Sequence, residues 1–222
     1  MLQHKNKRIL IYLFLFLTVG TFNNKNFHKF DNFKIDEITI TGLDEKNNFQ
    51  LIKKLNFLRT SNLFFLKKRD IEEIINSNNL VEKYSAFKIY PSSINIKIDK
   101  TKFLAQIKKN DDIFLLGSNG KLTKVKNKKK NLPFIFGKFE IQKFFELKKA
   151  IDETNFNYNE IKKLFFFKSG RWDLETSSGL LVKLPKDNFK SSLELILIFL
   201  SKNEIKIKNI DLRQHNQIII NE

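Results

Sequence analysis

The stretch Phe33-Lys-Ile-Asp-Glu-Ile-Thr-Ile-Thr-Gly-Leu43 decides the fold of the first half of the chain. Its isoleucines alternate with threonines, which is the pattern of a half-buried β-strand, and a glycine ends the run. Two short amphipathic helical patterns follow, and residues 81–98 then contain two strand-like runs joined at Tyr90-Pro91-Ser92-Ser93. We therefore expect the order strand, helix, helix, strand, strand in residues 33–101.

Helical and strand periodicity assigns an inner face to each of these elements. Asp44 precedes the first helical pattern and is expected to cap it through its side chain. Ile35 has the opposite parity to the strand that follows, so we expect a bulge or the strand entry near Asp36 and Glu37. The residues expected to face the core are Phe49, Ile52, Leu55 and Leu58 on the first helix, Ile71, Ile74 and Ile75 on the second, and Ile94, Ile96 and Ile98 on the last strand.

The second half, residues 102–222, is expected to form a mainly antiparallel β domain with two helices, which makes the fold class α+β. Turn signals such as Gly117-Ser-Asn-Gly120 separate its short apolar runs, and the four lysines within residues 126–130 indicate a solvated loop. The expected strands are residues 113–116, 121–123, 132–137, 161–167, 172–176, 179–184, 205–213 and 217–220, and the expected helices are residues 140–152 and 188–202.

An uncharged and almost wholly apolar run, Ile9–Phe22, follows three cationic residues near the N-terminus. Cations before an apolar run are the positive-inside signal, which places the N-terminus in the cytoplasm. These fourteen residues reach about 21 Å as a helix, but the reach from Arg8 to Lys25 is about 26 Å when both side chains snorkel. The residues expected to span the membrane include Ile9, Leu10, Leu13, Phe14, Leu15, Phe16, Leu17, Val19 and Phe22.

Two alternatives are open for this run. An uncleaved transmembrane anchor would occupy residues 9–24, between a cytoplasmic tail at 1–8 and a tether at 25–32. A cleaved signal peptide would end near Thr18-Val19-Gly20, a poor version of a small-residue cleavage site. We favour the anchor, and under both alternatives the bulk of the chain is exported from the cytoplasm.

The chain is strongly basic, with a formal net charge of +17. Such an excess favours anionic partners such as nucleic acid, phospholipid headgroups or an acidic protein. The lysines are spread along the whole chain, however, which favours a solvated surface. Residues 162–172 mix basic residues with three phenylalanines and a tryptophan, a composition that can stack bases. We favour a strand that buries its phenylalanines while lysines flank it.

No pattern in the sequence indicates catalysis or cofactor binding. The three histidines, at positions 4, 28 and 215, have no second ligand at metal spacing, and cysteine is absent. The glycine-rich signatures of nucleophile elbows, P-loops and dinucleotide-binding loops are also absent. We therefore expect no catalytic, cofactor-binding or metal-binding residues and a protein that is not an enzyme.

Five short motifs, in this order after an apolar N-terminal segment, resemble the FtsQ/DivIB family of bacterial cell-division proteins. They are Ile38-Thr-Ile-Thr-Gly-Leu43 with Tyr90-Pro91-Ser92-Ser93-Ile94, Gly117-Ser-Asn-Gly120, Leu132-Pro133 with Gly137, Arg171-Trp172-Asp-Leu174 with Gly179 and Val182-Lys-Leu184, and Ile210-Asp211-Leu212-Arg213. The chain departs from the family at the joint near Asp99–Ala105, which lacks a proline, and at Gln214, where an aromatic often stands.

The resemblance implies a single-pass inner-membrane protein whose POTRA domain and β domain lie in the periplasm at the division septum. It implies a scaffold that binds FtsB- and FtsL-type proteins and links early divisome proteins to the septal peptidoglycan synthases FtsW and FtsI, with FtsK as a further partner. The family positions at the FtsB contact match Arg213, Gln214, Asn216, Gln217 and Ile218, with Arg171 on a neighbouring strand.

The last predicted strand, residues 217–220, supplies a mechanism for such binding. It ends with Ile218, Ile219 and Ile220 close to the carboxyl end of the sequence, so one of its edges is expected to lack a partner strand. An unpaired edge offers N–H and C=O groups to an incoming strand, which is β-augmentation. The alternative is that these isoleucines only pack in the core. Because side chains alternate along a strand, one face can pack in the core while the other contacts a partner.

Two other functions are alternatives to the division scaffold. A POTRA-bearing envelope-assembly or export component would need a downstream outer-membrane barrel, and no amphipathic strand series of the required number follows Asp99. A soluble periplasmic hydrolase would need a nucleophile and a base in a convergent arrangement, for which the sequence offers no motif.

Overall fold

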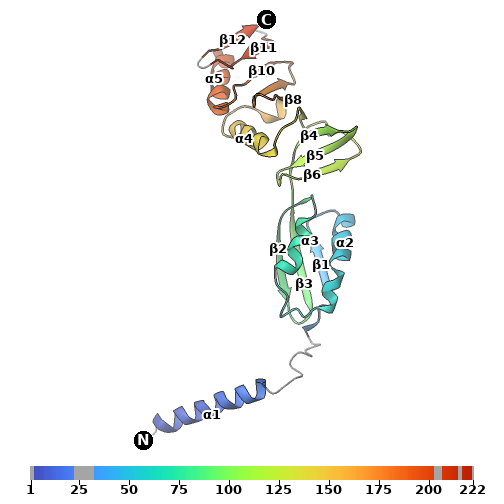
Figure 1. Cartoon of the computed structure of the whole chain (residues 1–222), viewed down its shortest axis with the longest axis vertical. Helices are drawn as coiled ribbons and strands as arrows, with labels where there is room; N and C mark the ends of the chain where they lie inside the picture. Colours follow the sequence, from blue (N-terminus) through green and yellow to red (C-terminus); the bar gives the residue numbers. More distant parts are fainter. Residues whose placement is uncertain (1–2, 23–32, 203–206, 215–216, 222) are drawn as a thin grey trace. The chain divides into compact units, whose positions relative to one another are not determined.

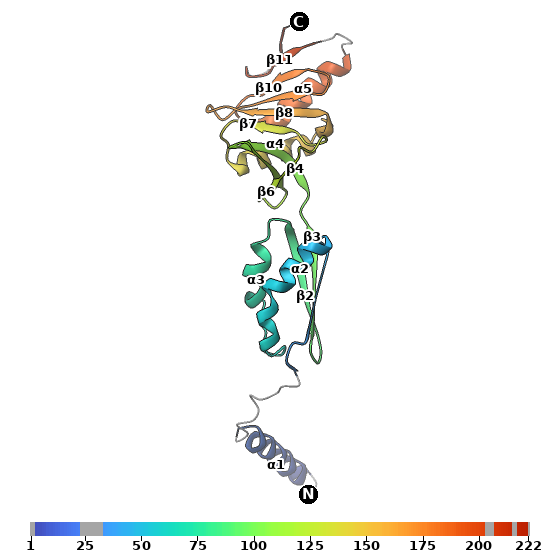
Figure 2. The ribbon, with the colours of Figure 1, turned by 90° about the vertical axis from the view of Figure 1, so that its right-hand side faces the viewer.

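The computed structural model describes residues 3–22, 33–202, 207–214 and 217–221. The chain divides into two compact units, one made of residues 1–78 and 83–99 and the other of residues 79–82 and 100–222. Figures 1 and 2 show the ribbon from two sides. The tether predicted at residues 25–32 lies outside the described residues.

Helix α1 (Gln3–Phe22) contains residues 9–22 of the predicted anchor, and residues 23 and 24 lie outside the described residues. Its apolar side chains from Ile9 to Leu17 are exposed. Over the described part of the chain, no helix combines the length and hydropathy required to cross a membrane.

The first unit folds as predicted, with two helices on one face of a three-stranded sheet (Figure 2). Its elements are β1 (Glu37–Thr41), α2 (Glu45–Lys54), the 3₁₀ helix η3 (Asn56–Thr60), α3 (Arg69–Asn76), β2 (Val81–Ile89) and β3 (Ser93–Lys100). The strand order is β1-β3-β2, with β1 and β3 parallel. Ile94, Ile96 and Ile98 are all buried, which confirms the predicted inner face of the last strand.

Two predictions for α2 were wrong. Leu55 and Leu58 are buried as predicted, but Leu51 also faces the core, whereas Phe49 is 55% exposed and packs its ring under the Lys53 ammonium, 4.6 Å from the ring centroid. Two adjacent stripes of apolar side chains fit the helical period, one through Phe49 and one through Leu51. Only the stripe through Leu51 packs against the sheet. Asp44 stands at the N-cap position but makes no side-chain cap bond, and its carboxylate accepts a hydrogen bond from the Asn47 side-chain amide, 2.6 Å away.

The second unit is built on a nine-stranded mixed sheet in the order β12-β11-β10-β9-β8-β7-β4-β5-β6. Neighbouring strands are antiparallel except at β4–β7, β7–β8 and β10–β11. The strands are β4 (Phe103–Lys109), β5 (Asp112–Gly117), β6 (Leu122–Val125), β7 (Phe134–Phe136), β8 (Ile161–Phe166), β9 (Trp172–Thr176), β10 (Leu181–Lys183), β11 (Asn209–Asp211) and β12 (Ile219–Asn221). The mainly antiparallel β domain is therefore observed, with parallel pairs added.

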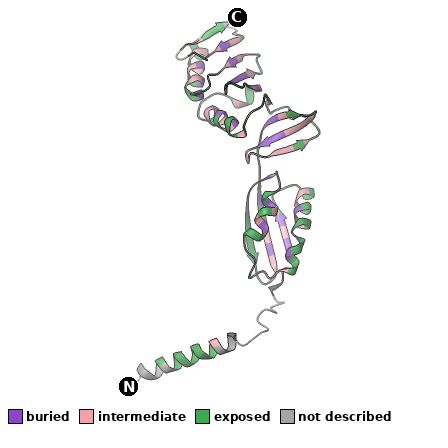
Figure 3. Cartoon of the chain, in the orientation of Figure 1, coloured by how far each residue is buried: buried purple, intermediate pink, exposed green. Residues whose placement is uncertain are grey.

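Helices α4 (Ile141–Asp152) and α5 (Phe189–Lys202) lie side by side against one face of this sheet (Figures 1 and 2). Both helices match their predicted positions. Their inner side chains cover a cross-strand apolar row formed by Ile135, Leu164, Leu174, Val182 and Ile210, which strand register places opposite one another from β7 to β11. We call this set the buried row. Figure 3 shows the buried residues of the sheet in purple and β12 in green.

Strand β4 was not predicted from the sequence, although it lies between β5 and β7 in the sheet. Its residues do not alternate cleanly, because Ala105 and the neighbouring Gln106 are both buried. The Gln106 side chain is accommodated by hydrogen bonds to backbone groups, so a polar residue occupies a position that periodicity would leave exposed.

Gly137→Ala is expected to lower the free energy of unfolding of the second unit by about 2–4 kcal/mol. Gly137 has φ +100°, and an added Cβ would overlap the backbone carbonyl oxygen of Phe166 on β8. Urea unfolding followed by the fluorescence of Trp172, the single tryptophan, measures the change.

Gly179→Ala is the matched control. Gly179 also has a positive φ, +86°, but no atom lies within 4 Å of its added Cβ. Its cost is the backbone strain alone, about 1–2 kcal/mol. Equal losses at the two glycines would contradict the close approach at Gly137.

Candidate partner-binding site

A second cross-strand row lies on the sheet face opposite α4 and α5, which we call the open face. Because successive side chains of a strand alternate between faces, this row is fixed by the buried row next to it. Its members are Phe136, Phe165, Asp173, Lys183, Asp211 and Ile219, placed opposite one another from β7 to β12. The row is aromatic at β7, alternates in charge across β9 to β11 and ends in an isoleucine at the edge strand.

Asp173 binds the first of the two predicted arginines. The Nε atom of Arg171 lies 3.4 Å from Oδ1 of Asp173, whose side chain is almost fully buried. Burial raises the pKa of Asp173, and the positive charges of Arg171, Lys183 and Arg213 oppose that rise. The guanidinium of Arg171 also lies 4.1 Å from the ring centroid of Phe167.

Asp211 binds the second predicted arginine more tightly. Nε of Arg213 lies 2.8 and 2.9 Å from the two carboxylate oxygens of Asp211, and the backbone N–H of Arg213 donates to the same group at 3.0 Å. These hydrogen bonds lower the pKa of Asp211. Both arginines are therefore already paired with an aspartate of their own sheet. An acidic partner would bind the guanidinium N–H groups that these pairs leave free.

The structure brings Arg171 and Arg213, which are far apart in sequence, into one electrostatic group. Both arginines and Lys183 act on the same buried carboxylate of Asp173. The two arginines were predicted as site residues from the sequence, whereas Asp173, Lys183 and Asp211 were not. A signal for the aspartates was present, because each stands two residues from its arginine and positions i and i+2 of a strand share a face.

Strand β12 forms one edge of the sheet. It pairs antiparallel with β11, and among the residues that the structure describes no other strand pairs with it. It begins two residues later than predicted, at Ile219. Ile219 and Ile220 are 41% and 38% exposed, and Ile218 packs partly against the core. The edge therefore presents backbone groups between two partly exposed isoleucines.

The residues just before β12 line a hollow of about 380 Å³ beside α5. Arg213, Gln214 and Gln217 form one wall, and Ser191 and Ser192 of α5 contribute to the other. The hollow adjoins the edge strand and is largely polar in its named residues. Asn216, the remaining predicted contact, lies outside the described residues.

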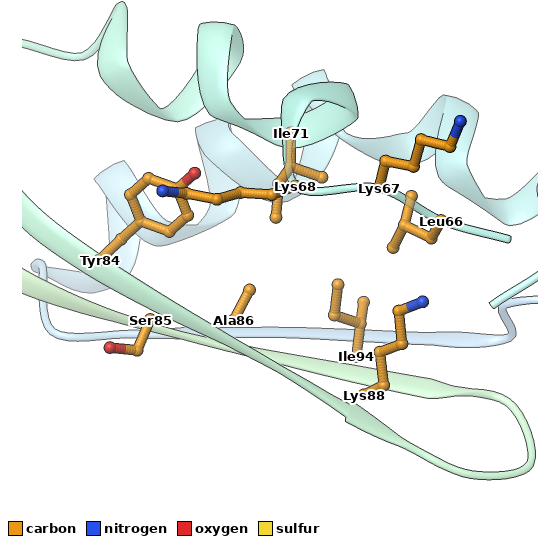
Figure 4. Close-up of a pocket in the computed structure, with 9 residues that line it drawn as sticks. All are labelled: Leu66, Lys67, Lys68, Ile71, Tyr84, Ser85, Ala86, Lys88 and Ile94. Carbon is orange, nitrogen blue, oxygen red and sulfur yellow. The ribbon is translucent and has the colours of Figure 1, made fainter. Parts of the chain in front are cut away.

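A separate groove lies in the first unit between α3 and β2 (Figure 4). Its apolar floor is formed by Leu66, Ile71, Ala86 and Ile94, and Lys67, Lys68 and Lys88 stand around it. The buried hydroxyl of Tyr84 has no hydrogen-bond partner among the described residues, and burial together with the charge of Glu72 raises the Tyr84 pKa. No group of three metal-ligating side chains occurs in the described part of the chain.

Two family models match the chain. One, described as the FtsQ-type POTRA domain, covers residues 33–100, and the other, described as the C-terminal part of cell division protein FtsQ/DivIB, covers residues 105–213. The second match ends before β12.

Similar whole sequences bear the same name. Cell division protein FtsQ of Rickettsia bellii is 24% identical over 192 residues, which is 85% of this chain and 72% of that protein. FtsQ of Rickettsia typhi is 25% identical over 198 residues with the same coverage, and FtsQ of Rhizobium meliloti is 20% identical over 74% of this chain and 54% of that protein.

Among solved structures, the major extracytoplasmic domain of the trans isomer of bacterial cell division protein DivIB from Geobacillus stearothermophilus is similar. It is 16% identical, with a TM-score of 0.35, and the match covers 47% of this chain and 98% of that chain.

Asp211→Asn is expected to destabilise the second unit at pH 7, and this loss should become smaller as the pH falls towards the folded-state pKa of Asp211. Arg213 holds the folded-state pKa of Asp211 below its unfolded value. The resulting stabilisation is therefore present above about pH 4 and is lost as the pH falls through the folded-state pKa. Urea midpoints from Trp172 fluorescence, measured between pH 3 and pH 7, test this.

Asp173→Asn should show the opposite pH dependence and serves as the paired variant. Burial holds the folded-state pKa of Asp173 above its unfolded value. Its contribution to stability is therefore present below about pH 4 and lost as the pH rises. The variant should gain stability relative to the wild type with increasing pH. Parallel pH profiles for the two variants would contradict opposite pKa shifts at Asp173 and Asp211.

Proposed function

This chain belongs to the FtsQ/DivIB family of cell division proteins, and from that premise we propose that it is a non-enzymatic scaffold of the division machinery that docks a partner strand on β12. The observation that carries the proposal is the edge position of β12, which pairs with β11 on one side only among the described strands. Ile219 and Ile220 flank the available backbone groups and are partly exposed.

The chemistry of docking is β-augmentation. An incoming strand would satisfy the unpaired N–H and C=O groups of β12 and extend the sheet by one strand. Each backbone hydrogen bond contributes about 0.5–1.5 kcal/mol, so a few of them set register and direction while side chains add specificity. The open-face row ends on Ile219, and its charges lie on the neighbouring strands, where an acidic side chain of the partner would meet Arg213.

We propose FtsB- and FtsL-type proteins as the partners at this edge, with Arg171, Arg213, Gln214, Asn216, Gln217, Ile218, Ile219 and Ile220 as the contact residues. The hollow beside Gln214 and Gln217 supports this assignment, because it offers polar groups next to the edge strand. Through these partners the scaffold would connect early division proteins, including FtsK, to the septal peptidoglycan synthases FtsW and FtsI.

We also propose that the N-terminus is an uncleaved membrane anchor. The cations before Ile9 and the exposed apolar side chains of α1 support residues 9–24 as the anchor, residues 1–8 as a cytoplasmic tail and residues 25–32 as a tether. A POTRA domain at 33–101 and a β domain at 102–222 would then lie in the periplasm at the septum.

Proline substitution in β12 is expected to weaken binding of the FtsB-type protein from the same genome by about tenfold. Successive N–H groups of a strand point to opposite sides, so of Ile219→Pro and Ile220→Pro one variant removes a donor from the free edge and the other from the β11 side. Co-purification from membranes and titration of the two purified proteins measure the loss. Removal of residues 216–222 should abolish binding altogether.

Trp172 fluorescence establishes whether each variant keeps the fold of the second unit. Ile198→Ser, which changes an exposed isoleucine of α5, is the control and should bind as the wild type does. Undiminished binding by both proline variants and by the truncated chain would overturn docking on β12.

The full-length protein is expected to remain in the membrane fraction after alkaline carbonate extraction and to begin at Met1. An apolar helix in the bilayer resists extraction, whereas a cleaved signal peptide leaves a shortened chain. Fractionation followed by N-terminal sequencing distinguishes the two, and a soluble chain that begins near residue 21 would contradict the anchor.

A further inference from the structure

A groove of about 1180 Å³ lies on the open face of the second unit, five strands away from β12. Two phenylalanines of β7, Phe134 and Phe136, form its apolar part, and Phe136 is 41% exposed. The loop that carries Lys128, Lys129 and Lys130 forms its rim. We call this surface the Phe–Lys groove.

Four of the six lysines that line the groove are available to a ligand, whereas Lys108 and Lys163 pair with Asp111 and Glu175. Lys128, Lys129, Lys130 and Lys162 form no ion pair with a described residue, and all four are exposed. Lys128 does contact an aromatic ring, since its Nζ lies 5.6 Å from the ring centroid of Phe134. The rim therefore carries uncompensated positive charge beside exposed apolar surface.

A buried side chain holds this loop in place. The amide of Gln106 on β4 is 1% exposed and makes three hydrogen bonds to the loop. It donates to the carbonyl oxygens of Lys129 and Leu132 at 2.6 and 2.7 Å, and it accepts from the backbone N–H of Lys129 at 2.6 Å. A solvated lysine loop needs no such support, whereas a preorganised loop binds a ligand with less loss of conformational entropy.

Each ring has one face already in contact with a neighbour. Phe136 stacks on Phe165 of β8, with centroids 5.2 Å apart and an interplanar angle of 18°, and the Lys128 ammonium lies over the ring of Phe134. A nucleic-acid base needs a free ring face for stacking. Ring edges carry the positive part of the aromatic quadrupole, so they suit carboxylates and aliphatic side chains instead.

We propose that the Phe–Lys groove binds an acidic protein segment that also carries apolar side chains. Carboxylates of the segment meet the lysine rim, and its apolar side chains cover Phe134 and Phe136. Because neighbouring strands are about 4.8 Å apart, the groove is about 24 Å from β12, so one short strand docked at that edge leaves it free. The proposal does not depend on the function proposed for β12.

The test measures binding of a short fluorescein-labelled peptide of alternating glutamate and leucine to the full-length protein in detergent, by fluorescence anisotropy. The Lys128→Ser, Lys129→Ser, Lys130→Ser variant should bind about tenfold more weakly, since three exposed charge pairs are lost. The Phe136→Ser variant should bind several-fold more weakly. Gln106→Leu should also weaken binding while all lysines are retained, because the loop is released.

The matched control is Lys46→Ser, Lys53→Ser, Lys54→Ser, which removes the same charge from the exposed surface of α2 and includes a lysine that contacts a phenylalanine. It should change the affinity less than twofold. The chain shortened to residue 215, which lacks β12, should bind the peptide as the full chain does, which separates this site from the edge strand.

Three results would overturn the proposal. One is an equal loss in the α2 control, which would show a general charge effect. Another is equally tight binding of a polyglutamate peptide of the same length, which would remove the aromatic contribution. The third is tighter binding of a single-stranded oligothymidine than of the peptide. Circular dichroism and Trp172 fluorescence confirm that each variant is folded before its affinity is compared.

Discussion

The second unit depends on one packing contact, the burial of a continuous apolar row under α4 and α5. Leu164, Leu174, Val182 and Ile210 are fully buried and stand opposite one another on four adjacent strands. A shift of one residue in any of these strands would exchange its buried and exposed side chains. The row therefore fixes which residues reach the opposite face, and with them the positions of the charges and aromatic rings that a partner would meet.

The first unit shows how far periodicity alone can predict a fold. The order of its elements and the buried face of β3 follow directly from alternation and from turn residues. The inner face of α2 did not, because Phe49 and Leu51 belong to neighbouring stripes that fit the helical period equally well. Only packing against the sheet decides which of the two stripes is buried. That sheet forms by pairing of β1 with β3, and local periodicity does not predict a pairing between strands so far apart in the sequence.

The strand order of the second unit could not be predicted from local sequence patterns for a related reason. Strand β7 lies between β4 and β8 and is parallel to both, and along the chain β5 and β6 separate it from β4 while α4 separates it from β8. Periodicity assigns faces within a strand but does not choose its neighbours. The candidate site shows the same limit. Arg171 and Arg213 could be named from motifs. That both of their positive charges act on the Asp173 carboxylate follows only from the order of β9, β10 and β11.

The short strand β7 also bears on how the second unit would carry force. Strands β4 to β6 form one antiparallel group and β8 to β12 are joined to them in the sheet only through the three residues Phe134–Phe136. The chain enters the unit at β4, whereas β12 lies at the far end of the order. Tension between the amino-terminal end and a ligand held on β12 would pass across β7 and then across β10 and β11, which are also three residues long. In mechanical terms, these short strands, and not the longer β4, β5 and β8, are where the sheet would first be expected to shear.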